Sequence, residues 1–203
     1  MKPYYDHEGI TIYHGDCRDI LPQIGIFDFV LTDPPYYGRE DLFSTESIPF
    51  VMDYLLRQDV PAFIFWPCMG DIPNNPDAVH IWHKSIPIHP NSQTGNVAGH
   101  HYERILSYGN GKKCLVFRVA AIMPNFAPCK KEFTIHPTQK PLRLIKELLG
   151  ISKGNTILDP FMGSGTTLVA AKSLNKKAVG IEIEEKYCEI AAKRLAQSVF
   201  DFG

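Results

Sequence analysis

The C-terminal part of the chain contains the pattern that most constrains its fold. The strand-like run "NTILDP" is followed by a glycine turn "FMGSGTT", a helical stretch "LVAAKSLN", a second strand-like run "KAVGIEI" and a second helical stretch "EEKYCEIAAKRLAQ". Strands that alternate with helices build parallel sheets, because each helix carries the chain back across the sheet in a right-handed crossover. The pattern predicts an α/β fold with a doubly wound, mostly parallel sheet.

The N-terminal part repeats this rhythm. The apolar runs "ITIYHG" and "FDFVLTD" flank a stretch long enough for a short helix, and the helical "FVMDYLLRQ" precedes a third apolar run, "PAFIFWP". Residues 68–110 are rich in Pro, Asn, Gly and His, which predicts irregular loops around edge strands. We expect another strand in "KCLVFRVAAI" and a helix in "LRLIKELLG", with Pro141 in its first turn and Gly150 just after its end.

Composition favours one soluble globular domain. The chain has 203 residues, of which 44% are hydrophobic and 21% are charged. No stretch approaches the roughly 20 apolar residues of a membrane span, and the N-terminus lacks a signal sequence, so we expect a cytoplasmic protein without membrane contact. The five cysteines form no CxxC pair and the eight histidines lack a matching cluster, so no metal site is predicted. A net charge of −1 restricts any nucleic-acid contact to local patches.

The glycine turn and a later acid indicate a nucleoside site. Gly163 and Gly165 permit a sharp turn and close approach of a ligand to the backbone. The G-x-G spacing lacks the third glycine of a dinucleotide motif and the lysine of a P-loop, so pyrophosphate binding is not favoured. Glu182 ends the next strand, where an acid can reach both ribose hydroxyls. The alternative is a tight turn that serves packing alone.

A second cluster follows an apolar strand in "LTDPPYYG". Pro34 and Pro35 fix the backbone and remove two N–H donors, and Asp33 is biased to an extended conformation by the proline that follows it. The loop therefore offers acceptors beside an aromatic face, Tyr36, which suits a planar group that carries an NH₂. Strong acceptors can make such an amine nucleophilic and stabilise the positive charge that develops on it. An ordinary strand exit is the alternative.

Several segments together resemble the DNA amino-methyltransferases that use S-adenosylmethionine. The segments are "TDPPY", "LDPFMGSGTT", "HPTQKP", "YHGDCRDIL" and "GIEIEEKYCEIAAKRL", and their order is that of the circularly permuted group. The resemblance implies one methyltransferase domain over residues 1–203, with a catalytic half at 1–118, a short target-recognition segment at 119–135 and a cofactor-binding half at 136–203. It also implies the Rossmann-like methyltransferase sheet of seven strands with one antiparallel edge strand.

The resemblance further implies a role for each site residue. Asp33 and the Pro35 carbonyl would accept from the target amine, within the motif that also contains Pro34, and Tyr36 would stack on a flipped-out base. Glu182 would bind the ribose of S-adenosylmethionine, and Asp16 would bind its adenine amine. The remaining cofactor-binding residues would be Thr138 and Lys140 at the methionine carboxylate, together with Asp159, Phe161, Gly163, Gly165, Thr166 and Ile183.

The sequence is compatible with more than one substrate. An Asp in the catalytic motif favours adenine, and the exocyclic amine of cytosine is the second candidate. Methylation at cytosine carbon would need a cysteine nucleophile after a proline, for which "WPC" offers Cys68, although a small apolar residue closing a strand is the simpler interpretation. A nucleic-acid-binding module that keeps the fold without catalysis is a candidate from another class.

The predicted partner is DNA. Only residues 39–46, about 68–101 and 119–135 are free to read its sequence, so we expect a specificity that is modest or is supplied partly by the second subunit of a homodimer. The candidate contacts with DNA phosphates are Arg39, Lys84, Lys130 and Lys131. The sequence is equally compatible with a solvated surface role for each of them.

Overall fold

The structure is a computed structural model, and it describes residues 1–35, 47–57, 59–68, 71–73, 75–84, 102–109, 111–119 and 139–197. The predicted site residues that lie outside these ranges are Tyr36, Arg39, Lys130, Lys131 and Thr138. Of the predicted target-recognition segment, the structure describes Val119 alone.

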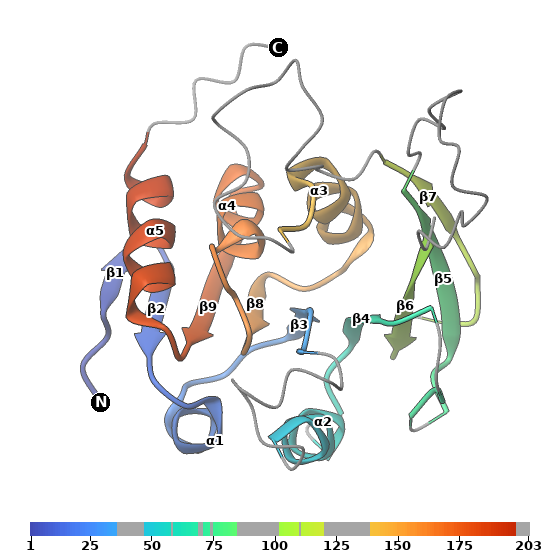
Figure 1. The fold of residues 1–203 in the computed structure, drawn as a ribbon, viewed down its shortest axis with the longest axis horizontal. Helices are drawn as coiled ribbons and strands as arrows, with labels where there is room; N and C mark the ends of the chain where they lie inside the picture. Colours follow the sequence, from blue (N-terminus) through green and yellow to red (C-terminus); the bar gives the residue numbers. More distant parts are fainter. Residues whose placement is uncertain are drawn as a thin grey trace, which may run out of the picture.

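One sheet runs through the molecule (Figure 1). In the described part of the chain it has nine strands, in the order β1-β2-β9-β8-β3-β4-β6-β5-β7. Their bounds are β1 Tyr5–His7, β2 Ile10–His14, β3 Phe29–Thr32, β4 Ala62–Trp66, β5 Ala78–His83, β6 Tyr102–Tyr108, β7 Val116–Arg118, β8 Thr156–Asp159 and β9 Lys177–Glu182. Strands β2, β9, β8, β3 and β4 are mutually parallel, and β6 is antiparallel to both of its neighbours.

The predicted doubly wound α/β fold is confirmed, with two differences in detail. The described sheet has nine strands instead of seven, because short strands β1 and β7 extend its two edges. The reversed strand β6 lies between β4 and β5 instead of at an edge, because it returns from β5 as that strand's antiparallel neighbour. At the opposite edge, β1 is also antiparallel. Its sequence, "YDH", is mostly exposed and carries no apolar signal, so the sequence did not predict it.

Helices cover both faces of the sheet. Their bounds are α1 Cys17–Ile20, the 3₁₀ helix η1 Leu21–Gln23, α2 Ser47–Arg57, α3 Leu142–Ile151, α4 Thr166–Ser173 and α5 Glu185–Ala196. Figure 1 shows α3, α4 and α5 together in its upper half and α1 and α2 in its lower half. No helix in the described ranges is long and apolar enough to span a membrane.

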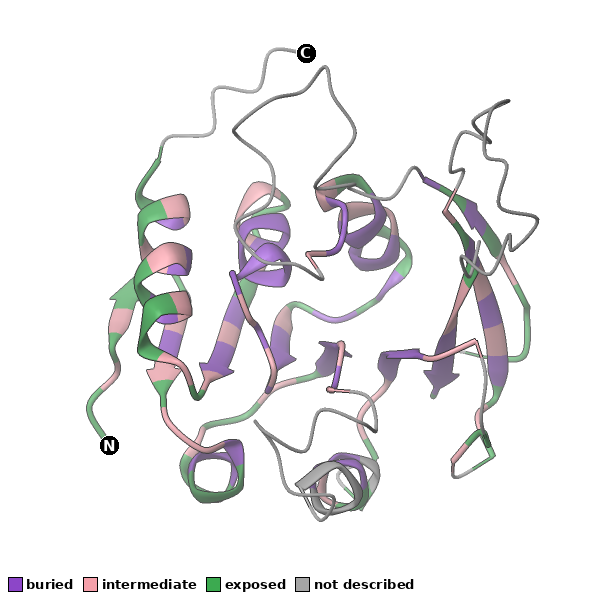
Figure 2. Cartoon of the chain, viewed as in Figure 1, coloured by how far each residue is buried: buried purple, intermediate pink, exposed green. Residues whose placement is uncertain are grey.

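Alternate residues of the central strands supply two hydrophobic cores. Phe63 and Phe65 of β4 pack with α3, α4 and α5, whereas Ala62 and Ile64 pack with α1 and α2. This division follows from the two-residue period of a strand, which points successive side chains to opposite faces. Every residue of β4 is buried, as expected for a strand that is covered on both sides, and Figure 2 shows the buried class concentrated along the sheet and the helix faces toward it.

Helix α3 differs from its prediction at both ends. Pro141 is the N-cap, with extended backbone (φ −61°, ψ 130°), and the helix begins one residue later. The helix also continues past Gly150, which the sequence placed just after its end. Ser152 is the C-cap: its N–H donates to the carbonyl of Leu148 and its hydroxyl donates to that of Leu149. These bonds satisfy two of the last four carbonyls of the helix without a glycine in the left-handed region.

Gly165 permits close packing of two helices. It is the N-cap of α4 in the left-handed region (φ 77°, ψ 28°), and a Cβ at this position would lie 2.7 Å from the Cβ of Ala191 on α5. We expect Gly165→Ala to lower the free energy of unfolding by about 1–3 kcal/mol, because the side chain adds both backbone strain and a clash. Urea denaturation measures this loss. Gly150→Ala is the matched control, since a Cβ there meets no atom within 4 Å and is expected to stabilise α3 by about 0.5–1 kcal/mol. Equal stability of wild type and Gly165→Ala would contradict this account.

Candidate active site

The sheet topology creates a crevice at the carboxyl ends of β8 and β3. The helix after β8 covers one face of the sheet and the helices after β2 and β3 cover the other, so the winding changes direction between these neighbouring strands. Ligands of doubly wound folds bind at such a switch point. A cavity of about 250 Å³ opens here. Its wall includes the predicted residues Asp16, Asp33, Pro34, Pro35, Lys140, Asp159, Phe161, Gly163, Thr166, Glu182 and Ile183. Segments far apart in the sequence therefore meet in one site.

Glu182 fastens the glycine turn to the end of β9. Its Oε2 accepts from the N–H of Gly163 at 3.0 Å, and its Oε1 accepts from the N–H of Glu184 at 2.8 Å. Burial raises the pKa of Glu182 above its ordinary value, although these backbone donors favour the charged form. The backbone bonds do not exhaust the roughly four acceptor positions of a carboxylate, and Glu182 borders the cavity. The side chain is thus fixed in place and retains acceptor capacity for a ligand hydroxyl.

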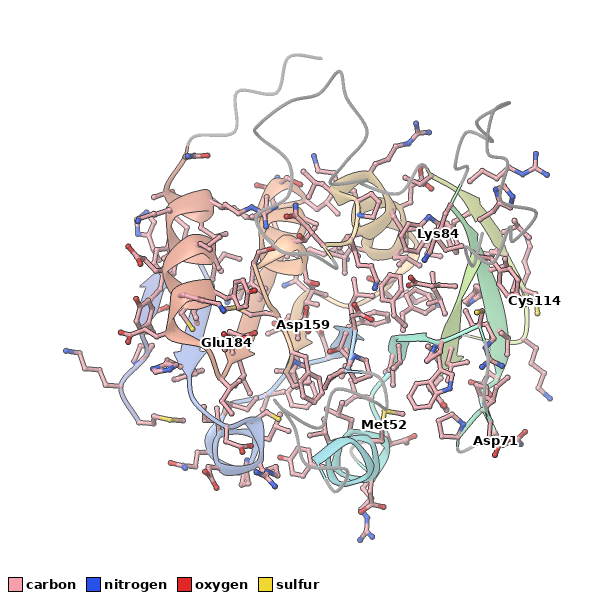
Figure 3. The ribbon with its side chains drawn as sticks, in the orientation of Figure 1. Met52, Asp71, Lys84, Cys114, Asp159 and Glu184 are labelled. Atoms are coloured by element: carbon pink, nitrogen blue, oxygen red, sulfur yellow. The ribbon has the colours of Figure 1, made fainter. Side chains whose placement is uncertain are left out.

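Asp159 joins β8 to β3 beneath the cavity. Its Oδ1 accepts from the hydroxyl of Thr32 at 2.8 Å and from the N–H of Phe161 at 3.2 Å. The residue is only 4% exposed, and burial raises its pKa to about 6. Figure 3 shows Asp159 near the middle of the molecule, with Glu184 to its left and Lys84 to its right. We infer that the main structural role of Asp159 is to connect the ends of β8 and β3.

The raised pKa of Asp159 predicts a pH-dependent effect on stability. Between about pH 4 and pH 6 the unfolded chain releases this proton while the folded chain retains it, so Asp159 lowers the free energy of unfolding as pH rises, and its full penalty is present above pH 6. We expect the stability of Asp159→Asn relative to wild type to increase by up to about 3 kcal/mol across this interval. Urea denaturation of both proteins at several pH values tests this. A difference that stays constant, or that decreases with pH, would contradict it.

Asp33 follows β3 and forms an ion pair at the cavity wall. Its Oδ2 accepts from Lys140 Nζ at 2.5 Å, and the same Nζ lies 3.2 Å from Glu103 Oε2. Burial alone would lower the pKa of Lys140, but the two carboxylates hold it above its ordinary value. Burial likewise opposes ionisation of Glu103, whereas Lys140 and Lys84 lower its pKa. Lys140 is therefore an ammonium ion and Glu103 is a carboxylate at neutral pH.

Asp16 is a charged group of the cavity wall, close to the end of β9. It caps α1 by accepting from the N–H of Arg18 at 2.8 Å, and the Arg18 guanidinium approaches its carboxylate to 2.6 Å. The hydrogen bonds from Arg18 lower the pKa of Asp16 below its ordinary value. The carboxylate is therefore ionised and oriented, and it also borders the cavity.

Three residues that the sequence singled out lie elsewhere. Gly165 is not among the described residues of the cavity wall and packs against α5 instead. Lys84, a candidate DNA contact, forms an ion pair with Glu103 at 2.6 Å, and its ammonium lies 5.4 Å from the centre of the Trp82 ring. Cys68 is half-buried and is likewise absent from the described wall, which removes the geometric support for a cysteine nucleophile.

Two charged residues that contact the cavity wall from behind were not predicted. Arg194 of α5 donates to the carbonyl of Ser164 at 2.5 Å and so supports the glycine turn. Its position in "AAKRLAQ" looks like an ordinary exposed helix position. Glu103 had a detectable signal, because in "YERILSY" it shares a strand face with the buried Ile105 and Ser107. A carboxylate on the buried face of a strand requires a partner.

The polar groups of the cavity fit the S-adenosylmethionine that the sequence resemblance implies. Glu182 and Asp16 contribute fixed carboxylates from neighbouring segments of the wall, since the Gly15 N–H donates to the Glu182 carbonyl, and Phe161 and Ile183 contribute apolar surface. The Oε1 of Gln139, another residue of the wall, is buried without a hydrogen-bond partner among the described residues. An amine, two hydroxyls and a planar base would each find a matching surface here. Within the described residues, no group of three or more His, Cys, Asp or Glu could hold a metal ion.

Comparisons of the sequence with known proteins identify DNA methyltransferases as relatives. Residues 71–193 match the model of a family described as DNA methylase. The Type II methyltransferase M.ScaI of Streptomyces caespitosus is 29% identical in an alignment that covers 98% of this chain and 86% of that protein. M2.DpnII of Streptococcus pneumoniae, also a Type II methyltransferase, is 52% identical over 62 residues, which are 30% of this chain and 23% of that protein.

Solved structures also include proteins that resemble this chain. The M1.HpyAVI–SAM complex superimposes with a TM-score of 0.64 at 26% identity, covering 93% of this chain and 100% of that one. The cytosine-N4-specific PvuII DNA methyltransferase gives a TM-score of 0.68 over 98% of this chain and 91% of that one. Its identity is 13%, so this second likeness supports the fold alone.

Proposed function

Because this chain belongs to the DNA methylase family of S-adenosylmethionine-dependent amino-methyltransferases, we propose that it methylates the exocyclic amino group of a flipped-out adenine in DNA. One observation supports this most strongly. Asp33, in the rigid loop after β3, borders the same cavity as the glycine turn and Glu182. The acceptor for a planar amine and the groups suited to a nucleoside therefore face a common space.

The chemistry follows from the acceptor loop. An aromatic amine is a weak nucleophile because its lone pair is delocalised into the ring. In the proposed reaction, the Asp33 carboxylate and the Pro35 carbonyl accept the two amine hydrogens, which draws the nitrogen toward a tetrahedral form and stabilises the positive charge that develops on it. S-adenosylmethionine supplies the electrophilic methyl group when bound. Asp33 contributes as an acceptor whether or not it finally takes the proton.

The remaining residues position the reactants. Flipping a base from a duplex costs a few kcal/mol, and stacking on Tyr36 together with the amine hydrogen bonds would offset that cost. Glu182 would bind the ribose hydroxyls, Asp16 the adenine amine, and Lys140 with Thr138 the methionine carboxylate. The other residues proposed at the cofactor are Asp159, Phe161, Gly163, Thr166 and Ile183. We retain the division into a catalytic half (1–118), a target-recognition segment (119–135) and a cofactor-binding half (136–203).

Two alternatives concern the substrate. The exocyclic amine of cytosine has the same chemistry, and we favour adenine because the catalytic motif begins with Asp. A module that binds nucleic acid without catalysis would keep the fold and lose the reaction. As proposed phosphate contacts we keep Arg39, Lys130 and Lys131, whereas Lys84 is better explained by its ion pair with Glu103. A homodimer acting in the cytoplasm would let a second subunit share the recognition of DNA.

A labelling assay tests the proposal. The protein is incubated with methyl-labelled S-adenosylmethionine and unmethylated duplex DNA of mixed sequence, and the DNA is digested to nucleosides and separated. We expect label in N6-methyladenine. Label confined to N4-methylcytosine would overturn the choice of base while keeping the reaction, and label in 5-methylcytosine would overturn the amine mechanism. No label on any DNA, combined with measurable DNA binding, would favour the binding module.

A further inference from the structure

Alternating charges run from the cavity wall into the protein. The first contact joins Lys140 to Asp33 at 2.5 Å, and the second brings Lys140 within 3.2 Å of Glu103 Oε2. The other oxygen of Glu103, Oε1, lies 2.6 Å from Lys84. The side chains of Lys140 and Glu103 are 10% and 14% exposed, so solvent screens their charges weakly. Asp33 and Lys140 border the cavity, whereas Glu103 is not among its described wall residues.

The two carboxylates beside Lys140 are not equivalent. Asp33 accepts a short, directed hydrogen bond from the ammonium group. Glu103 Oε2 is buried and receives no well-directed hydrogen bond from the described residues, although the same ammonium lies 3.2 Å away. A small shift of Nζ would therefore strengthen its contact with Glu103 and weaken its contact with Asp33. Glu103 is a buried acceptor with unused capacity next to a shared ammonium.

The difference between the two carboxylates affects Asp33 in its proposed role as the acceptor of the target amine. In the structure an ammonium group occupies one acceptor position of Asp33 and neutralises its charge. The target amine needs both the position and the charge, because the nitrogen becomes positive as it attacks. A second carboxylate that competes for the ammonium lowers the cost of releasing Asp33. The ion pair with Lys84 holds Glu103 in the orientation that this competition requires.

We propose that Glu103 is a positioning residue for methyl transfer, which takes the Lys140 ammonium from Asp33 when the target amine arrives. The inference rests on the proposed function, since it assumes that Asp33 accepts from an amine. Glu103 acts through Lys140 and touches neither the cofactor nor the base. Lys140 has three N–H donors, so its proposed contact with the methionine carboxylate is compatible with a shift between Asp33 and Glu103. The shift therefore changes the rate of methyl transfer much more than the affinity for S-adenosylmethionine.

The variant Glu103→Gln separates this role from a structural one, because it keeps the shape of the side chain and removes its charge. We expect its single-turnover rate, at saturating S-adenosylmethionine and DNA, to fall about 10- to 100-fold. Calorimetry is expected to give a dissociation constant for S-adenosylmethionine within about threefold of wild type. Glu103→Asp retains the charge on a shorter side chain and should recover part of the rate.

The matched control is Glu189→Gln, which removes an exposed carboxylate paired with Lys193 at 2.6 Å on α5. It should transfer methyl groups at the wild-type rate. A wild-type rate in Glu103→Gln would overturn the inference, and so would a parallel loss of rate, cofactor affinity and thermal stability. If wild type binds S-adenosylmethionine but methylates no DNA, the proposed function fails. In that case a crystal structure with S-adenosylmethionine and adenosine tests the role of Glu103. A Lys140 ammonium that lies nearer to Glu103 than to Asp33 supports the proposed shift, and an unchanged ion pair with Asp33 overturns it.

Discussion

Replacing Asp33 with alanine is expected to lower the rate of methyl transfer about 10²- to 10³-fold, the usual cost of removing one group that stabilises charge in a transition state. The Pro35 carbonyl would remain as an acceptor in the rigid loop, but it is uncharged and cannot replace the carboxylate. Asp33→Asn should be nearly as slow, since it keeps an acceptor oxygen and loses the charge. Single-turnover rates at saturating S-adenosylmethionine and DNA measure both effects.

Cofactor binding and a cysteine variant serve as controls for Asp33. We expect Asp33→Asn to bind S-adenosylmethionine within a few-fold of wild type, because the carboxylate is assigned to the amine and not to the cofactor. Cys68→Ser should retain activity, since Cys68 is not among the described residues of the cavity wall. Retained activity in Asp33→Ala, or its loss in Cys68→Ser, would show that the acceptor loop is not the catalytic centre.

Glu182→Ala is expected to weaken binding of S-adenosylmethionine by about 10²- to 10⁴-fold. Two hydrogen bonds to a charged acceptor contribute roughly 1.5–3 kcal/mol each, and the truncation also leaves the N–H groups of Gly163 and Glu184 without their acceptor. The glycine turn would then lose its side-chain connection to β9, while the bond from the Met162 N–H to the Ile181 carbonyl remains. Isothermal titration calorimetry measures the change in affinity.

The matched control for Glu182 is Glu185→Gln, which alters an exposed carboxylate in the first turn of α5. Its affinity for S-adenosylmethionine should equal that of wild type. Denaturation of Glu182→Ala distinguishes a local loss from general unfolding. Wild-type affinity in a folded Glu182→Ala protein would remove Glu182 from the cofactor site.

Local patterns made the cofactor side of the site predictable. The segment from Thr156 to Glu182 contains a strand, a turn, a helix and a strand in direct succession, so neighbours in the sequence are also neighbours in space. The glycines, the acid that ends the strand and the helical period are all visible within that window. The confirmed α/β fold depended largely on this segment.

Contacts between distant segments were not predictable. The sequence separation between Asp33 and Lys140 is 107 residues, and Glu103 reaches the same cluster from the reversed strand β6. No local pattern indicates that the carboxylates of Asp33 and Glu103 share the Lys140 ammonium group. The position of β6 between β4 and β5 depends likewise on sheet pairing over long separations. Packing and electrostatics of the whole fold decide such features.

The central claim is that this chain methylates an exocyclic amine of DNA through Asp33. The most direct measurement is base-resolved sequencing of DNA, with mass spectrometry of its nucleosides, from a host that lacks adenine methylation and expresses either wild type or Asp33→Ala. We predict N6-methyladenine at one recurring sequence with wild type and its absence with the variant. Unmodified DNA in the presence of folded wild-type protein, or the same modification with Asp33→Ala, would contradict the claim.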